Sequence, residues 1–369
     1  MTASLQAQEP PGDDGIDVDL GEAYYKNSRE EETRWTGEII ASIKRALDKR
    51  YAEGRRPALR DAHAFDTGCV KAIFRVDPNL KPELRHGMFV PGKGYAAWIR
   101  FSNGNSEQRS RFIPDARGMA IKLIGVPGDK LIGDEKNTHD IVLISNPAFF
   151  VDDLERYHAT LEAFLRGSLW DQFVVALLKL RFPDEIWRAL RVNLLLISNP
   201  LFRQYWSMTP YRLGADAPAR MAVKYTAKPR IGQRSPWSSR AGAFLSWGYS
   251  LKQEMNDTLA RTEFYFDFYV QRRVGDRTPI EDSKIVWPEE ISAPEHVAKI
   301  IIPSQNIMSQ DQARFCENLS FNPWNCLPEH KPLGLVNRVR RSAYRSISEY
   351  RHALNRVPKI EPTGDETFV

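Results

Sequence analysis

Three residues near the C-terminus carry side chains that together could bind a metal. Arg340 and Tyr344 are four residues apart and Arg351 follows seven residues later, so a helix of 3.6 residues per turn would place them on one stripe. A phenol with its usual pKa of about 10 ligates metals poorly at neutral pH, but a neighbouring guanidinium favours the phenolate. The second guanidinium can pair with a ligand carboxylate. The alternative is an amphipathic basic helix with a half-buried tyrosine.

A second candidate is His63, which follows Arg60 in the segment Arg-Asp-Ala-His just ahead of the first predicted strand. A histidine in this position can project into the ligand site of a barrel and exchange protons near neutral pH. The alternative is a structural histidine that hydrogen-bonds to the backbone.

Composition narrows the functional classes. The 369 residues are 42% apolar and 27% charged, as in ordinary globular proteins. The net charge of +5 comes from scattered residues without a long basic run, so nucleic acid is not an expected partner. Three cysteines without a CxxC pair argue for a reducing, cytoplasmic location and against a disulfide or zinc framework. The polar N-terminus does not resemble a signal peptide, and no apolar run is long enough to span a membrane.

The hydrophobic pattern predicts an α+β fold. Helices are expected over 30–50, 152–198 and 337–356, from their amphipathic periodicity. Alternating or apolar runs predict strands over 70–77, 95–102, 118–124, 140–145, 220–227, 261–273 and 297–302. Seven or eight such strands could close an antiparallel barrel whose mouth holds a ligand. We expect a flexible tail over 1–25 and a single domain over 26–369, with a helical insertion at about 152–205.

Seven short motifs follow one another along the chain. They are Arg60-x-x-His63-Ala64, Arg100-Phe101-Ser102, Asp115-x-Arg117-Gly118-x-Ala120-x-Lys122, Asn137-Thr138, Val286-Trp287-Pro288, Phe321-x-Pro323-x-Asn325-x-x-Pro328, and Arg340-x-x-x-Tyr344 with Arg351 beyond it. In order and internal spacing these motifs resemble those of the haem catalase family, over roughly residues 55–355. The resemblance implies a catalase-like antiparallel β-barrel core, with haem b bound between the barrel and the C-terminal helices.

The resemblance also implies roles for individual residues. Tyr344 would be the axial iron ligand, with Arg340 hydrogen-bonded to its phenolate oxygen. His63 and Asn137 would be the catalytic pair on the opposite, distal face of the haem. The remaining haem-binding residues would be Arg60, Arg100 and Arg351 at the propionates, Ser102 beside them, and Phe150 stacked on the porphyrin, with Phe149 as the alternative.

The chain also departs from the family. His63-Ala-Phe-Asp-Thr-Gly68 replaces the usual His-Ala-x-Gly-x-Gly, the chain is shorter than most catalases, and the Pro-Asp-Thr-His run is missing after Tyr344. In these respects the chain resembles the smaller catalase-related haem proteins, which include organic-peroxide peroxidases and fatty-acid allene oxide synthases. We therefore expect a haem enzyme acting on hydrogen peroxide or on organic or fatty-acid hydroperoxides. The apolar and basic segment over 164–205 could pack as a helix pair, form a dimer surface, or receive such a lipid.

Two other functions remain compatible with the sequence. The same site could belong to a haem-binding or sensing protein without turnover, or the barrel could carry lipid without haem. A peripheral contact with a membrane surface and assembly into a homo-oligomer are left open, since no residue pattern specifies either.

Overall fold

The computed structural model describes residues 15–51, 54, 57–61, 63–104, 116–166, 199–216, 218–230, 232–233 and 251–368. The α-helices are α1 (Arg29–Tyr51), α2 (Leu154–Arg166), α6 (Leu251–Leu259), α7 (Gln310–Asn318) and α8 (Leu335–Asn355). The strands are β1 (Asp66–Val76), β2 (Gly94–Asn103), β3 (Arg117–Ile124), β4 (Thr138–Ile144), β5 (Tyr205–Trp206), β6 (Tyr211–Leu213), β7 (Met221–Pro229), β8 (Phe264–Arg272) and β9 (Glu295–Ile302).

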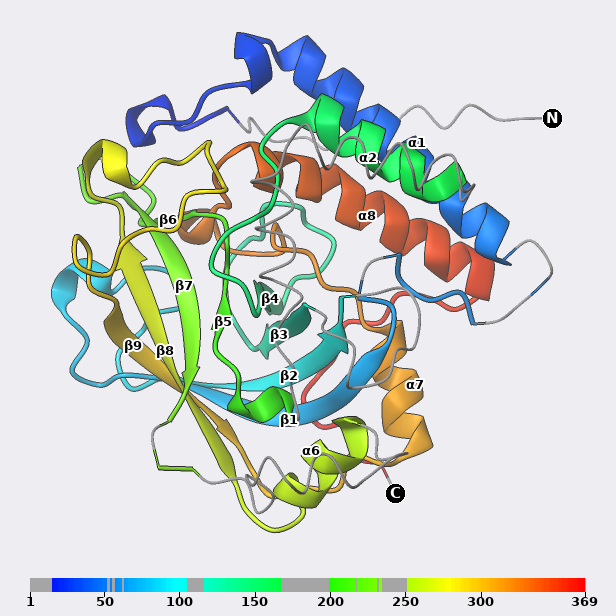
Figure 1. The fold of residues 1–369 in the computed structure, drawn as a ribbon. Coiled ribbons are helices and arrows are strands. Elements are labelled where there is room, and N and C mark those ends of the chain that lie inside the picture. Colours follow the sequence, from blue (N-terminus) through cyan, green and yellow to red (C-terminus); the bar gives the residue numbers. More distant parts are fainter. Residues whose placement is uncertain are drawn as a thin grey trace, which may run out of the picture.

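The strands form an antiparallel barrel. Their order in the sheet is β5-β4-β3-β2-β1-β9-β8-β7, and β5 pairs back onto β7, so that eight strands close on themselves while β6 extends β7 (Figure 1). Closure depends on the two-residue strand β5, whose Tyr205 lies opposite Ala227. The predicted α+β class and barrel core are confirmed.

The barrel interior is a packed apolar core. Every second residue of β8 points inward, and Phe264, Phe266 and Phe268 are almost fully buried, as period-two alternation predicts. Side chains from all the long strands of the barrel join them in one contiguous cluster. A ligand therefore cannot share this interior without displacing the core.

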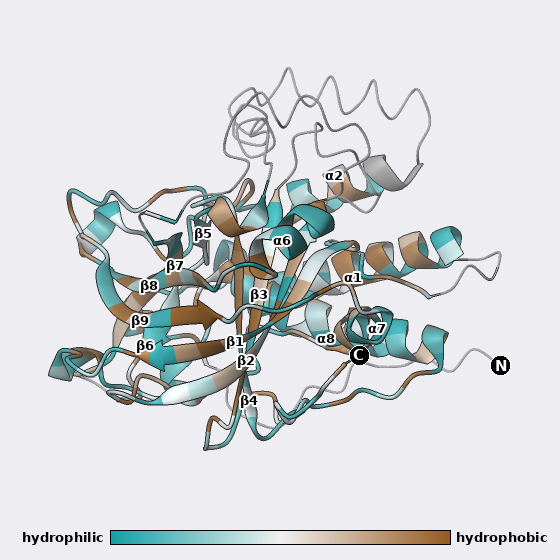
Figure 2. Ribbon diagram, turned by 90° about the horizontal axis from the view of Figure 1, so that it is seen from below, coloured by the Kyte–Doolittle hydropathy of each residue, from teal (hydrophilic) through white to brown (hydrophobic). Residues whose placement is uncertain are grey.

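Three helices form a layer beside the barrel. Figure 1 shows α1, α2 and α8 running side by side, and α1 contacts both of the others. The hydrophilic and hydrophobic stretches that alternate along α1 in Figure 2 reflect this one-sided burial. Their shared apolar core consists of Tyr25, Ile39, Ile43, Leu47, Leu154, Leu335 and Val339. This layer places α8, with the predicted metal-binding tyrosine, against the outer face of the barrel.

Several sequence predictions need correction. The short elements β5, β6, α6 and α7 were not predicted, and β5 begins where the insertion predicted at about 152–205 ends. Only α2 of its helices can be compared, since 167–198 lie outside the described residues. Residues 15–25, predicted as part of a flexible tail, pack against the body through buried Asp17 and Glu22.

The cysteines differ from expectation. Cys69 on β1 and Cys316 on α7 form a disulfide across 247 residues, while Cys326 is a buried free thiol. The prediction against a disulfide was wrong because the contact between α7 and β1 leaves no trace in cysteine spacing. In the part of the chain that the structure describes, no helix is long and apolar enough to cross a bilayer.

Candidate functional site

His63 sits in a tight turn that Arg100 holds in place. Its backbone φ of 56° is left-handed, a conformation that is uncommon for residues other than glycine. The guanidinium of Arg100 on β2 donates hydrogen bonds to the carbonyl oxygens of His63, at 2.9 Å, and Ala64, at 3.0 Å. Since such backbone strain persists only where the surroundings enforce it, these two bonds explain how the imidazole is positioned.

The imidazole of His63 lies against the outer face of β2 and β3. Its Nδ1 is 3.1 Å from the hydroxyl oxygen of Ser102, which pairs with Gly118 across the two strands. A Cβ at Gly118 would lie 2.8 Å from that Nδ1 and 2.6 Å from Ser102 Oγ, distances too short for real contacts. The glycine of the Asp-x-Arg-Gly motif is therefore required because the histidine ring occupies the space of a side chain.

The electrostatic surroundings keep His63 neutral. Burial, together with the positive charges of Arg100 and Arg340, lowers the pKa of His63 to about 4. Arg340 comes from α8, near the C-terminus, and its charge acts on His63, which lies near the N-terminus. The predicted distal residue His63 and the predicted Arg340–Tyr344 pair therefore lie close enough to interact electrostatically. A neutral imidazole can accept a proton from a ligand at physiological pH.

Arg340 and Tyr344 meet on one face of α8, as predicted. Arg340 Nη2 donates to the Tyr344 hydroxyl at 3.2 Å, and the guanidinium carbon lies 5.1 Å from the ring centre. The other end of the guanidinium donates to Asn337 Oδ1 at 3.1 Å and to Thr209 Oγ1 at 3.5 Å. Arg340 is therefore fixed on both sides, and its buried charge stands next to the phenol oxygen.

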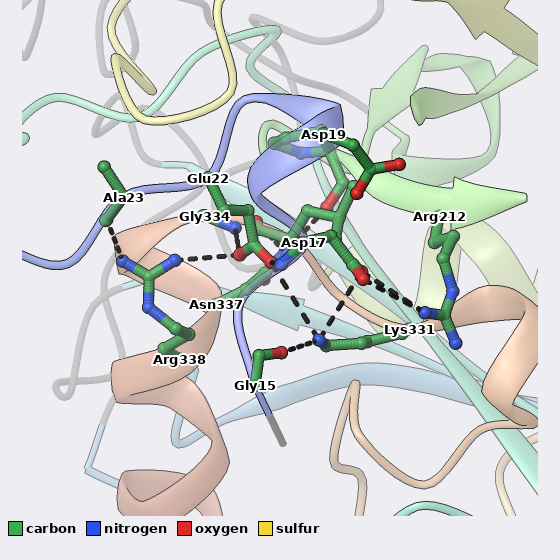
Figure 3. A network of polar contacts seen from close by, with 12 residues as sticks. Gly15, Asp17, Asp19, Glu22, Ala23, Arg212, Lys331, Gly334, Asn337 and Arg338 are labelled. Carbon is green, nitrogen blue, oxygen red and sulfur yellow. Dashed lines mark hydrogen bonds and ion pairs between the residues drawn. The ribbon is translucent and has the colours of Figure 1, made fainter. Parts of the chain in front are cut away.

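The N-terminal segment fixes the start of α8 (Figure 3). A carboxylate oxygen of the fully buried Glu22 side chain accepts from the Gly334 backbone N–H at 2.7 Å and from Arg338 at 2.8 Å. Glu281 accepts from the Leu335 N–H at 2.7 Å. Carboxylates at these positions accept hydrogen bonds from N–H groups that have no partner within the helix, and they interact favourably with the positive end of the helix dipole. Tyr344 is thus carried by a helix whose first turn is anchored by ion pairs.

Three arginines, one of them on α8, pair with a single carboxylate near the end of α7. Glu317 at the end of α7 pairs with Arg60 at 2.8 Å, Arg351 at 3.3 Å and Arg100 at 3.6 Å. Arg351 and Arg60 also donate to the Glu317 backbone carbonyl, at 2.8 and 3.3 Å. We call Arg60, Arg100 and Arg351 the arginine cluster. The predicted propionate-binding residues are therefore brought together, and Glu317 is a member of the site that the sequence did not reveal.

The positive charge of the arginine cluster is only partly neutralised by Glu317. Burial lowers the pKa of Arg100 to about 10 and that of Arg351 to about 9, and the charge of Arg60 contributes to both. Among the described residues, three guanidinium groups share one carboxylate in ion pairs, which leaves two positive charges. A ligand with two carboxylates, such as haem b, fits this excess. The phenol of Tyr344 likewise fits as an iron ligand. Half-buried Ala120 and Val142 lie opposite each other on β3 and β4.

Comparisons with solved structures show which known fold the chain shares. No family model and no curated protein sequence matches the chain. A fungal catalase structure aligns with a TM-score of 0.59 and 17% identity, over 87% of this chain and 64% of its own. The chain has the catalase fold. A bacterial catalase aligns with a TM-score of 0.60 and 17% identity, over 85% of this chain and 62% of its own. Catalase A from Saccharomyces cerevisiae aligns with a TM-score of 0.58 and 18% identity, over 87% of this chain and 67% of its own. The chain therefore covers less than two thirds of the fungal and bacterial catalases.

On this catalase fold, Asn137 lies apart from His63. It directly precedes β4, whose Thr138 pairs with Ile124, whereas Gly118 beside His63 pairs with Ile144 at the other end. Six residues of strand separate the two ends by about 20 Å. Asn137 is also exposed, and its N–H donates to Glu361 in the C-terminal segment. The predicted pairing of His63 with Asn137 is corrected: the Asn-Thr motif falls at the wrong end of the hairpin.

Phe150 stands at the edge of the site. Its side chain is 37% exposed, and its ring centre is 4.6 Å from that of Phe149 and 6.1 Å from that of Tyr157 on α2. The pKa of Tyr157 is raised to about 12, first by burial and then by Asp61 and Tyr344. Phe150 thus neighbours a phenol within electrostatic reach of Tyr344, whereas no described contact joins Phe150 to His63.

Proposed function

We propose that this protein is a haem-dependent oxidoreductase that acts on peroxides, with Tyr344 as the iron ligand. The observation that carries the proposal is the position of Arg340, which hydrogen-bonds to Tyr344 and also acts on the pKa of His63. A phenol and a neutral imidazole from opposite ends of the chain thus share one site. Haem, when bound, supplies the redox chemistry of O–O bond cleavage.

The residues around the site provide binding and orientation. Tyr344 would ligate the iron, and the arginine cluster would pair with the two propionates through charge-assisted hydrogen bonds. Ala120 and Val142 on the outer face of β3 and β4 would contact the apolar part of the porphyrin. The catalase fold of the chain is consistent with this cofactor, and the packed barrel interior argues against a lipid carrier that binds inside the barrel.

His63 would move the proton of the substrate. Its Nδ1 contacts Ser102, so Nε2 is the nitrogen that would accept a proton from the hydroperoxide and return it to the departing oxygen. The low pKa keeps this nitrogen unprotonated above about pH 4. Proton transfer by a positioned side chain typically contributes about 10²–10⁴ in rate.

The amide role predicted for Asn137 is better assigned to Asn146. Ser145 and Asn146 directly follow β4 at the end that lies beside Gly118 and His63. The Ser145 hydroxyl is already engaged by the Arg117 backbone N–H at 2.9 Å. Asn146 is half-buried and retains an amide oxygen that can accept a hydrogen bond from a hydroperoxide.

A peroxide panel on haem-loaded protein tests the proposal. The protein is supplied with haem, and then with hydrogen peroxide, an alkyl hydroperoxide or a fatty-acid hydroperoxide. We expect oxygen release, oxidation of an added donor, or rearrangement of the lipid peroxide, and the responsive peroxide identifies the substrate class. A protein that binds haem but gives none of these products is a non-catalytic haem binder, and one that takes up no haem refutes the proposal.

A further inference from the structure

The arginine cluster contains a carboxyl group of its own, that of Glu317. Glu317 uses both carboxylate oxygens: Oε1 faces Arg60 and Arg351, and Oε2 faces Arg100. Its backbone carbonyl is also engaged by two of the three. The side chains of Arg100 and Arg351 are only 3% and 2% exposed, so the pairing takes place largely away from solvent. Glu317 is therefore a built component of the site and differs from an exposed surface ion pair.

One carboxylate cannot neutralise three guanidinium groups. Asp66 acts on Arg100 electrostatically but is itself paired with Lys252 at 3.5 Å. The Nε of Arg100 is buried and has no hydrogen-bond partner among the described residues. Unneutralised buried charge is unfavourable, so two further negative charges would be needed to neutralise the cluster. Without Glu317, three would be needed.

We propose that Glu317 sets the net charge of the arginine cluster at +2, which matches a ligand with two carboxylates and limits how strongly the cluster attracts anionic groups. This inference rests on the proposed haem function and concerns how the cofactor is chosen and positioned. Glu317 is a positioning residue in this account, because it acts through the arginines. The cluster should consequently prefer a porphyrin with two free propionates over one in which they are esterified, and the size of that preference should depend on Glu317.

The test uses iron-free protoporphyrin IX and its dimethyl ester as probes, so that binding at the arginines is measured without iron ligation. Porphyrin fluorescence gives the dissociation constants, and thermal unfolding gives the midpoint of the apoprotein. The variants are Glu317→Gln, the shorter acid Glu317→Asp, and the charge-restored pair Arg60→Gln with Glu317→Gln. Glu349→Gln on the exposed side of α8 is the matched control.

We expect Glu317→Gln to lower the apoprotein midpoint and to raise the preference for the diacid over the diester about tenfold or more, since the cluster gains one net charge. Glu317→Asp and Glu349→Gln should stay close to wild type, and the charge-restored pair should move both readouts back. If Glu317→Gln fails to fold, recovery of folding in the charge-restored pair supports the proposal, and no recovery overturns it.

Two further outcomes separate this inference from the proposed function. Wild-type protein that binds the diacid, with an unchanged or smaller diacid preference in Glu317→Gln, overturns the role of Glu317 alone. Wild-type protein that binds neither porphyrin refutes the haem function, and the inference with it.

Discussion

Arg340 donates a hydrogen bond to the Tyr344 hydroxyl across 3.2 Å, from one helical turn earlier in α8. The geometry is fixed from behind by Asn337 and Thr209, which accept from the other terminal nitrogen. Because Arg340 is buried, its charge acts on the phenol oxygen through a medium that screens it weakly. This pair is the structural basis for the proposal that Tyr344 ligates haem iron.

Replacement of Arg340 by leucine should weaken haem binding while the fold is retained. Partners of a metal ligand typically contribute about 10- to 100-fold in affinity or activity, so we expect haem loss to a competing apoprotein to accelerate within that range. Arg345→Gln, on the same helix but paired with Asp134 and Glu349 at the surface, is the control. Equal rates of haem loss in the two variants would disprove the role of Arg340.

Peroxide reactivity should depend on His63 and not on Asn137. His63→Ala should retain haem and lose about 10²–10⁴ in rate with the responsive peroxide. Asn146→Ala should lose a smaller factor, and Asn137→Ala should react as wild type because Asn137 lies at the far end of β4. Stopped-flow absorbance measures all three. A large defect in Asn137→Ala would restore the original pairing and contradict the described register.

Much of this site was predictable from sequence, because its residues occur in short motifs whose spacing is set by one helix turn or one strand. Arg340 and Tyr344 share a helix face as expected, and Arg100 and Ser102 share the outer face of β2. The long strands were predicted because their inward residues alternate. The two-residue β5 was not, because a strand of that length has no period to detect.

The errors have a common origin in contacts between distant segments. Glu317 gave no signal, since its role exists only where α7 meets residues 60, 100 and 351. The Cys69–Cys316 disulfide and the docking of residues 15–25 are of the same kind. Asn137 was misplaced because a motif match does not reveal which end of a hairpin faces the site, whereas the pairing of Gly118 with Ile144 does.

Gly118→Ala should displace His63 rather than simply destabilise the protein. The added Cβ would lie within 3 Å of both Ser102 Oγ and His63 Nδ1, so the imidazole must move. We expect near-normal haem content with at least a tenfold loss of peroxide reactivity, of the order assigned to loss of positioned proton transfer. Gly37→Ala on α1 has open space around it and should be neutral or slightly stabilising, by about 0.5–1 kcal/mol. Wild-type peroxide kinetics in Gly118→Ala would contradict the packing described for His63.

Stability should fall on acidification through a buried histidine outside the site. Burial lowers the pKa of His330 to about 3, whereas an unfolded histidine titrates at about 6.5. Between these values the unfolded chain binds a proton that the folded chain does not, so stability declines as pH falls, by about 1.4 kcal/mol per unit. Asp140, with its pKa raised to about 7 by burial, acts in the opposite direction.

The comparison of wild type with His330→Gln isolates that contribution. Denaturant titrations between pH 6.5 and pH 4 should give a shallower dependence of unfolding free energy on pH in the variant, by about the same 1.4 kcal/mol per unit. His330 also hydrogen-bonds to Tyr225 at 2.9 Å and accepts from the Met88 N–H at 3.1 Å, so the variant will be less stable overall. The slope is therefore the diagnostic quantity, and identical slopes would show that His330 is not buried in its neutral form.

The central claim is that the Tyr344 phenolate ligates haem iron, and the haem content and absorption spectrum of Tyr344→Phe test it most directly. Tyr350→Phe, six residues further along α8 and bonded to Asp48 at the surface, is the matched control. We expect wild type and Tyr350→Phe to bind haem with the same high-spin ferric spectrum of the tyrosinate type, and Tyr344→Phe to lose most of its haem. Normal haem content together with an unchanged spectrum in Tyr344→Phe would contradict the account.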